Sequence, residues 1–137
     1  MTHTNRAAAA AGALLAVTGL LTAGPAEAAS RDIAPGDRLH LAVTRGNDSS
    51  GILRDGLLRC DPPSGHAHAA EACDELAAAG GDIGRIPAED VFCPMIFAPV
   101  TARARGRWDG RWIDFRETYT SACVLRARTR HVFALDG

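Results

Sequence analysis

The sequence predicts an α+β domain with about five strands, mostly antiparallel, and one main helix. Three observations support this prediction. Apolar and polar residues alternate in several short segments, the pair Asp109-Gly110 is a strong hairpin signal, and one alanine-rich segment carries apolar residues at helical spacing.

The first two strands are predicted on either side of a polar turn. Residues 39–44 alternate, with Leu39, Leu41 and Val43 sharing one face. Residues 45–51 form the turn, and a second strand is expected over 52–60. Gly56 weakens that strand, so a bulge is expected in its first half.

The main helix is predicted over Ala69–Ala79, where Cys73, Leu76 and Ala77 recur at helical spacing. Gly80-Gly81 supplies a stop at its C-terminal end. Residues 82–90 are expected to be irregular, with one helical turn from Asp82.

The second half is predicted to contain three strands. One alternates from Val100 to Arg105 and turns back at Asp109-Gly110, because both central residues of a type I′ turn need positive φ. Its return strand places Ile113, Phe115 and Tyr119 on one face, and Trp112 and Asp114 on the other. A last strand is expected over 130–135.

Residues 1–28 are interpreted as a secretory signal peptide, followed by one domain over 29–137. Arg6 precedes an apolar run, and Ala26-Glu27-Ala28 fits the small-x-small pattern before a cleavage site. The alternative is a membrane anchor, but glycine and threonine interrupt the run and no charge cluster follows it. The sequence therefore predicts a secreted, extracellular protein.

Composition argues against several functions. The formal net charge is −1, so bulk electrostatics favours neither nucleic acid nor membrane. An even number of cysteines in a small exported chain predicts disulfides, and a zinc site lacks the close C-x-x-C pairs. His66 and His68 lack further nearby ligands, so no metal or cofactor is expected. We predict no enzyme, because the histidines lie outside known catalytic motifs and lysine is absent.

The most informative stretch lies between two prolines. Each proline removes a backbone donor and biases the preceding residue towards extended geometry. The segment between them is therefore expected to be extended, either exposed for a reader of extended peptides such as a protease, or buried as a strand with proline ends. The stretch reads Cys93-Pro94-Met95-Ile96-Phe97-Ala98-Pro99.

This stretch resembles the reactive-site loop of the Streptomyces subtilisin inhibitor family. Similar matches are the helix Ala72–Ile83, the approach Glu89–Cys93, the hairpin Gly106–Arg111 and the C-terminal segment Val132–Leu135. The resemblance implies a five-stranded antiparallel sheet with two helices on one face. It also implies homodimers formed through the outer sheet face, and the bridges Cys60–Cys73 and Cys93–Cys123.

The resemblance further implies a standard-mechanism inhibitor of extracellular subtilisin-like serine proteases, with Met95–Ile96 as the reactive bond. Cys93, Pro94, Phe97, Ala98 and Pro99 would complete the contact loop. Where the family often has a supporting asparagine, this chain has Ser121, so loop support is expected to differ. The alternative function is a secreted binding module that keeps the fold but no longer inhibits.

Overall fold

A computed structural model describes residues 36–47 and 51–136 of the 137-residue chain. The predicted signal peptide and the first residues of the predicted domain lie outside the described residues.

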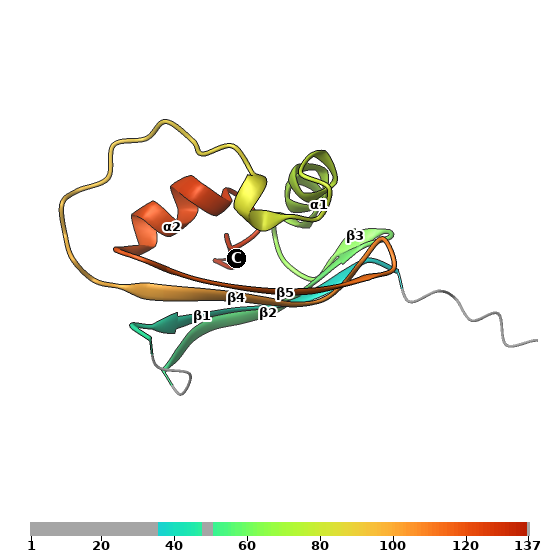
Figure 1. Cartoon of the computed structure of the whole chain (residues 1–137), viewed down its shortest axis with the longest axis horizontal. Coiled ribbons are helices and arrows are strands. Elements are labelled where there is room, and N and C mark those ends of the chain that lie inside the picture. Colours follow the sequence, from blue (N-terminus) through green and yellow to red (C-terminus); the bar gives the residue numbers. More distant parts are fainter. Residues whose placement is uncertain (1–35, 48–50, 137) are drawn as a thin grey trace, which may run out of the picture.

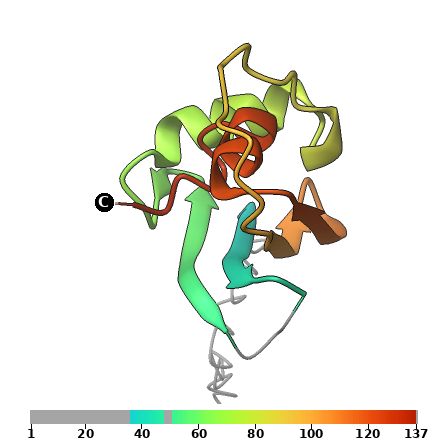
Figure 2. The same ribbon diagram turned by 90° about the vertical axis from the view of Figure 1, so that its left-hand side faces the viewer.

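The described chain forms one antiparallel sheet with its helices on one face (Figures 1 and 2). The strand order is β3-β2-β1-β4-β5, so the first strand in sequence lies in the middle of the sheet. The helices are α1 (Ala69–Ala78) and α2 (Ala122–Thr129), with a short 3-10 helix, η1 (Ile83–Arg85). The strands are β1 (Arg38–Arg45), β2 (Ile52–Cys60), β3 (Pro63–Ser64), β4 (Val100–Trp108) and β5 (Arg111–Tyr119). The predicted fold class, including the two helices on one face, is confirmed.

The alternating segments form strands because one side of each can be buried. Leu39 and Leu41 of β1 are fully buried under the helices, while the neighbouring His40 is exposed. The predicted bulge occurs in the first half of β2, between the pairs Val43–Arg54 and Thr44–Ile52. Gly56 itself pairs regularly with Leu41, so the bulge does not lie at the glycine.

The predicted turn chemistry is also observed. Asp109 and Gly110 have φ values of 48° and 72°, which a type I′ hairpin turn requires. Gly81 follows α1 with φ of 81°, and a Cβ atom there would lie 2.4 Å from the Trp108 ring. Only glycine therefore allows the chain leaving α1 to pass so close to the end of β4.

The structure corrects the last strand. Residues 130–135 form a turn and an irregular segment, and the fifth strand is instead the two-residue β3. The residues before this segment, Ala122–Thr129, form α2, which no periodicity in the sequence indicated. Val132 and Phe133 are nevertheless buried, so they fill the core between sheet and helices without joining a strand ladder.

Both bridges have the pairing that the resemblance implied. Cys60–Cys73 joins the end of β2 to α1, and Cys93–Cys123 joins the loop before β4 to the first turn of α2. Each helix is thus covalently attached to another part of the domain, which suits a small fold with a limited core.

Candidate functional site

The segment between the two prolines is an exposed loop and not a buried strand. It forms the long connection from η1 to β4, and it arches away from the sheet beyond α2 (Figure 1). Met95 is fully exposed, at 102% of its reference surface, and Phe92 and Phe97 are exposed by 92% and 79%. Large apolar side chains in a contiguous exposed patch mark a binding surface, because water is a poor environment for them.

The N-terminal side of the loop is braced by α2. The bridge from Cys93 reaches Cys123, with 5.7 Å between the two Cα atoms. Upstream, the Glu89 amide donates a 2.7 Å hydrogen bond to the Ala127 carbonyl of the same helix. The helix therefore holds the approach to the loop at two points.

The C-terminal side is braced by the sheet. The Ala98 amide donates a 3.0 Å hydrogen bond to the Thr120 carbonyl, just beyond β5. The Pro99 carbonyl accepts a 2.7 Å hydrogen bond from Gly46, which follows β1. At Val100 the chain enters β4 and pairs with Tyr119. The loop is thus fixed on both sides of its apolar tip.

Between these anchors the backbone is available to a partner. Among the described residues, the only backbone hydrogen bond from residue 92 to residue 97 is local, from the Ile96 amide to the Pro94 carbonyl at 2.8 Å. This bond closes a three-residue turn with Met95 at its centre. The Met95 side chain consequently lies at the most exposed point of the loop, and no charged residue occurs between positions 91 and 102.

Ser121 acts on the helix that braces the loop. It is the N-cap of α2, and its buried hydroxyl oxygen accepts a 3.3 Å hydrogen bond from the Val124 amide. This bond satisfies one of the free amides at the helix start. The expected difference in loop support is therefore indirect, through the helix that carries Cys123.

The base of the loop also contains one perturbed titratable group. Tyr119 is buried at the end of β5, and its hydroxyl donates a 3.1 Å hydrogen bond to Glu117. Burial, and then the neighbouring carboxylate, raise the pKa of Tyr119 well above its ordinary value. The phenol therefore stays neutral and serves packing at the loop base.

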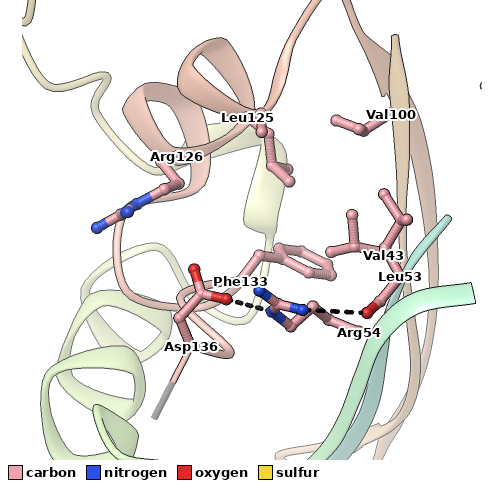
Figure 3. Close-up of a pocket in the computed structure, with 9 residues that line it drawn as sticks. Val43, Leu53, Arg54, Val100, Leu125, Arg126, Phe133 and Asp136 are labelled. Carbon is pink, nitrogen blue, oxygen red and sulfur yellow. Dashed lines mark hydrogen bonds and ion pairs between the residues drawn. The ribbon is translucent and has the colours of Figure 1, made fainter. Parts of the chain in front are cut away.

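A cavity of about 220 Å³ lies under α2, away from the loop tip (Figure 3). Phe133 and Leu125 supply apolar walls, while Arg54 and Asp136 form an ion pair at its rim (Figure 3). The nine residues that line this cavity include no serine, cysteine or histidine. They offer no nucleophile and base pair of the kind that hydrolytic catalysis needs.

The histidines considered as metal ligands have structural surroundings. The His66 Nδ1 atom accepts a 3.2 Å hydrogen bond from the His68 amide, and His68 lies beside the ring of His131. His131 contacts the Glu75 carboxylate at 2.6 Å, which ties the C-terminal segment to α1. Within the ranges that the structure describes, no three ligand-type side chains are grouped to hold a metal ion.

These features define a small disulfide-bridged domain that presents a rigid, apolar, extended loop to a partner. The profile of the family "Subtilisin inhibitor-like" matches residues 35–121. A Streptomyces avermitilis protein named "Putative serine protease inhibitor" is 56% identical over 126 residues, covering 91% of this chain and 85% of that protein. The "Subtilisin inhibitor" of Streptomyces albogriseolus is 36% identical over 123 residues, covering 86% of this chain and 85% of that protein.

A solved structure shares the fold. It is Streptomyces caespitosus sermetstatin in complex with Bacillus licheniformis subtilisin, at 31% identity and a TM-score of 0.60. The alignment covers 71% of this chain and 96% of that one. This chain belongs to the subtilisin inhibitor-like family.

Family membership supports protease inhibition as the activity of this domain. The relatives are named as inhibitors and not as enzymes, and this chain likewise is not an enzyme. None of the helices that the structure describes has the length and apolar character needed to cross a bilayer.

Proposed function

We propose that this protein is a secreted inhibitor of subtilisin-like serine proteases, that it acts by the standard substrate-like mechanism, and that Met95–Ile96 is its reactive bond. The observation that carries the proposal is the fully exposed Met95 at the tip of a loop anchored on both sides. The sermetstatin structure, in which a protein of the same fold is in complex with subtilisin, supports the protease class.

The proposed contact loop extends over residues 93–99, with Cys93, Pro94, Phe97, Ala98 and Pro99 flanking the reactive bond. From residue 92 to residue 97 its backbone groups have no partner elsewhere in the part of the domain that the structure describes, so a protease can pair with them as it pairs with a substrate. The bridge and the hydrogen bonds hold this shape before binding. A loop ordered in advance loses little entropy on association, which favours tight binding through a small interface.

Met95 is the residue we assign to the primary specificity pocket. Its side chain is long, flexible and uncharged, so it fits an apolar pocket and adapts to its shape. A trypsin-like pocket contains a buried aspartate that methionine leaves without a partner. Subtilisin-like and chymotrypsin-like enzymes are therefore the expected targets, and trypsin-like enzymes are poor ones.

Slow turnover follows from the same restraints. After acylation, the free amine of Ile96 remains attached to the domain through Ala98 and β4, while the acyl group remains attached through Cys93. The amine is held near the acyl-enzyme, where it competes with water, and the peptide bond forms again. The protein thus binds as a substrate but releases product slowly.

The proposal places the protein outside the cell. A signal-like sequence over 1–28 and two disulfides with no free cysteine in the described chain support export to an oxidising compartment. Detection of the chain in culture medium with a new N-terminus near Ala29 tests this part. The homodimer that the family resemblance implies stays a prediction, and sedimentation of the purified protein tests it.

Titration of subtilisin with the purified protein tests the main proposal. We expect residual activity to fall linearly to zero near one inhibitor loop per enzyme, and mass spectrometry to find at most one nick, at Met95–Ile96. Rapid digestion without lasting inhibition would identify a mere substrate. An intact protein that leaves activity unchanged would favour the alternative, a secreted binding module.

A further inference from the structure

Two adjoining cavities open between α2 and the sheet, and the proposed reactive bond lines neither of them. The first, of about 220 Å³, lies under α2 (Figure 3), and the second, of about 490 Å³, lies beside the base of the contact loop. Leu53, Val100 and Ala122 line both cavities, so the two form one groove. We call it the α2 groove.

The deep part of the α2 groove is apolar. Val100 of β4, Leu125 of α2 and Phe133 of the C-terminal segment are buried and form its walls. Leu53 lies at the entrance, where 39% of its surface is exposed. An apolar cavity of about 150 Å³ holds a molecule the size of benzene. The first cavity therefore has room for an aliphatic chain of about six to eight carbons.

The entrance of the groove is positively charged, although the chain as a whole is not. Arg54 and Arg126 line the first cavity, and Arg45 lines the second. Asp136 is the only acidic residue among the described residues that line the groove. All four side chains belong to exposed residues. Three positive charges and one negative charge give the entrance a formal charge of +2, compared with −1 for the complete chain.

One carboxylate already occupies this entrance. The Arg54 Nε atom donates to Asp136 in an ion pair, and its Nη1 atom donates a 3.3 Å hydrogen bond to the Leu53 carbonyl (Figure 3). The hydrogen bond from Arg54 lowers the pKa of Asp136, and the charges of Arg54 and Arg126 add to this effect against the opposing effect of burial. A guanidinium has five N–H donors, and these contacts use two of them. Arg54 can therefore bind a second carboxylate.

We propose that the α2 groove binds a free aliphatic monocarboxylate, with its chain between Val100 and Leu125 and its carboxylate at Arg54. Charge complementarity selects the head group, because a positive entrance favours an anion and disfavours an amine. The apolar walls select the tail. The groove lies on the helix side of the sheet (Figures 1 and 3), so a second copy on the outer sheet face, as the family resemblance implies, would leave it open.

The experiment titrates the intact, isotopically labelled protein with sodium octanoate and follows its NMR spectrum. Octanoate should saturate one site per chain and shift the methyl signals of Val100 and Leu125. Each CH₂ group added from butanoate to octanoate should tighten binding about fourfold. Octan-1-ol and octylamine have the same tail and should bind about tenfold or more weakly than octanoate, because they lack the charged acceptor. Equal affinity for octanoate and octan-1-ol would overturn the proposal.

The two partners of the ion pair should have opposite effects on octanoate binding. Arg54→Gln should weaken it about tenfold or more, because the head group loses its donor. Asp136→Asn should tighten it about two- to fivefold, because the competing carboxylate is gone. Arg85→Gln removes the same charge from an exposed position that lines neither cavity, and it should bind like the parent. Weaker binding in both Arg54→Gln and Asp136→Asn would show that the ion pair only maintains the groove, and would overturn the proposal.

A blocking variant tests the location of the site. Ala122 is exposed and lines both cavities, so the larger side chain of Ala122→Trp should fill the entrance and abolish octanoate binding. Unchanged binding in a folded Ala122→Trp would overturn the proposal, and if this variant does not fold, the Arg54 and Asp136 variants decide.

Two further arms distinguish other occupants and the separate proposal of inhibition. Co-sedimentation of the parent with phosphatidylglycerol vesicles, abolished by Ala122→Trp, would assign the groove to a lipid surface and overturn the assignment to a free acid. Met95→Gly should bind octanoate like the parent, and octanoate binding is measured without a protease. Failure of either proposal therefore leaves the other testable.

Discussion

Removing the Cys93–Cys123 bridge should convert a lasting inhibitor into a substrate. The double variant Cys93→Ser/Cys123→Ser leaves the loop attached on its C-terminal side, through Ala98 and β4. On its N-terminal side only the Glu89–Ala127 hydrogen bond remains, well upstream of the reactive bond. After cleavage at Met95–Ile96 the acyl group would no longer be held opposite the amine. Hydrolysis would then outcompete re-formation of the bond, and inhibition would fade with time.

The magnitude follows from the loop that the bridge closes. A sequence separation of 30 residues gives about 3.7 kcal/mol of stabilisation in the chain-entropy model. A loss of this size is a large part of the stability of a small domain. General instability must therefore be separated from loss of loop restraint.

The second bridge provides that control. Cys60→Ser/Cys73→Ser removes a bridge with a separation of 13 residues, which the same model values at about 3.0 kcal/mol. It lies between β2 and α1 and leaves the loop anchors intact. The two double variants should thus lose similar stability, but only the first should lose lasting inhibition.

The assay follows residual subtilisin activity and the inhibitor's mass in parallel, at a temperature where circular dichroism shows both variants folded. The parent and the control variant should accumulate at most a single nick while activity stays suppressed. The loop variant should be nicked, then degraded, while activity returns. If it remains intact and inhibits for as long as the control variant, the bridge is not what holds the cleaved ends together.

Three further predictions concern single residues. Met95→Lys should gain strong trypsin inhibition. Met95→Gly should weaken subtilisin binding by one to two decades, because a methionine side chain contributes about 1.5–3 kcal/mol on burial. Unchanged inhibition constants for both variants would place the contact loop elsewhere. Ser121→Ala should lower the free energy of unfolding by about 1 kcal/mol, and Ser121→Asn should restore it, since both serine and asparagine cap helices well; urea denaturation measures this, and equal stability of all three would exclude a capping role. Burial, together with His68 and His131, lowers the pKa of His66 against the opposing effect of Glu71. The unfolded chain therefore binds more protons, and stability should fall as pH drops below about 6.5. His66→Asn should flatten this part of the curve of unfolding free energy against pH, and an unchanged slope would assign it to other groups.

Local patterns predicted most of the fold. The alternation in β1, β4 and β5, the Asp109-Gly110 turn and the glycine stop after α1 each follow from constraints on a few adjacent residues. The strand predicted over 130–135 was wrong because it too rested on a local pattern alone. Its apolar residues are buried as predicted, but burial alone does not distinguish a strand from an irregular segment packed on the core.

The helix α2 depended on tertiary structure. It is only eight residues long, too short to be stable by its own propensity, and it is held by the Ser121 cap and by the bridge at Cys123. The residue pattern alone left the loop over 93–99 undecided between exposed and buried, because prolines at both ends suit either state. The anchors at Thr120, Gly46 and Cys123 decided this, and they come from segments distant in sequence.

The sequence by itself determined the turns, the main helix and which residues of β1, β4 and β5 share a face, since each depends on the spacing of near neighbours. Only the tertiary structure decided that the loop is exposed and that Arg59, Arg38 and Arg107 lie side by side across three strands. Net charge sums over the whole chain and contains no positions, so the total of −1 does not report such clustering. The register of the strands joins residues as far apart in sequence as Arg38 and Arg107, and hydrogen bonding between strands sets that register.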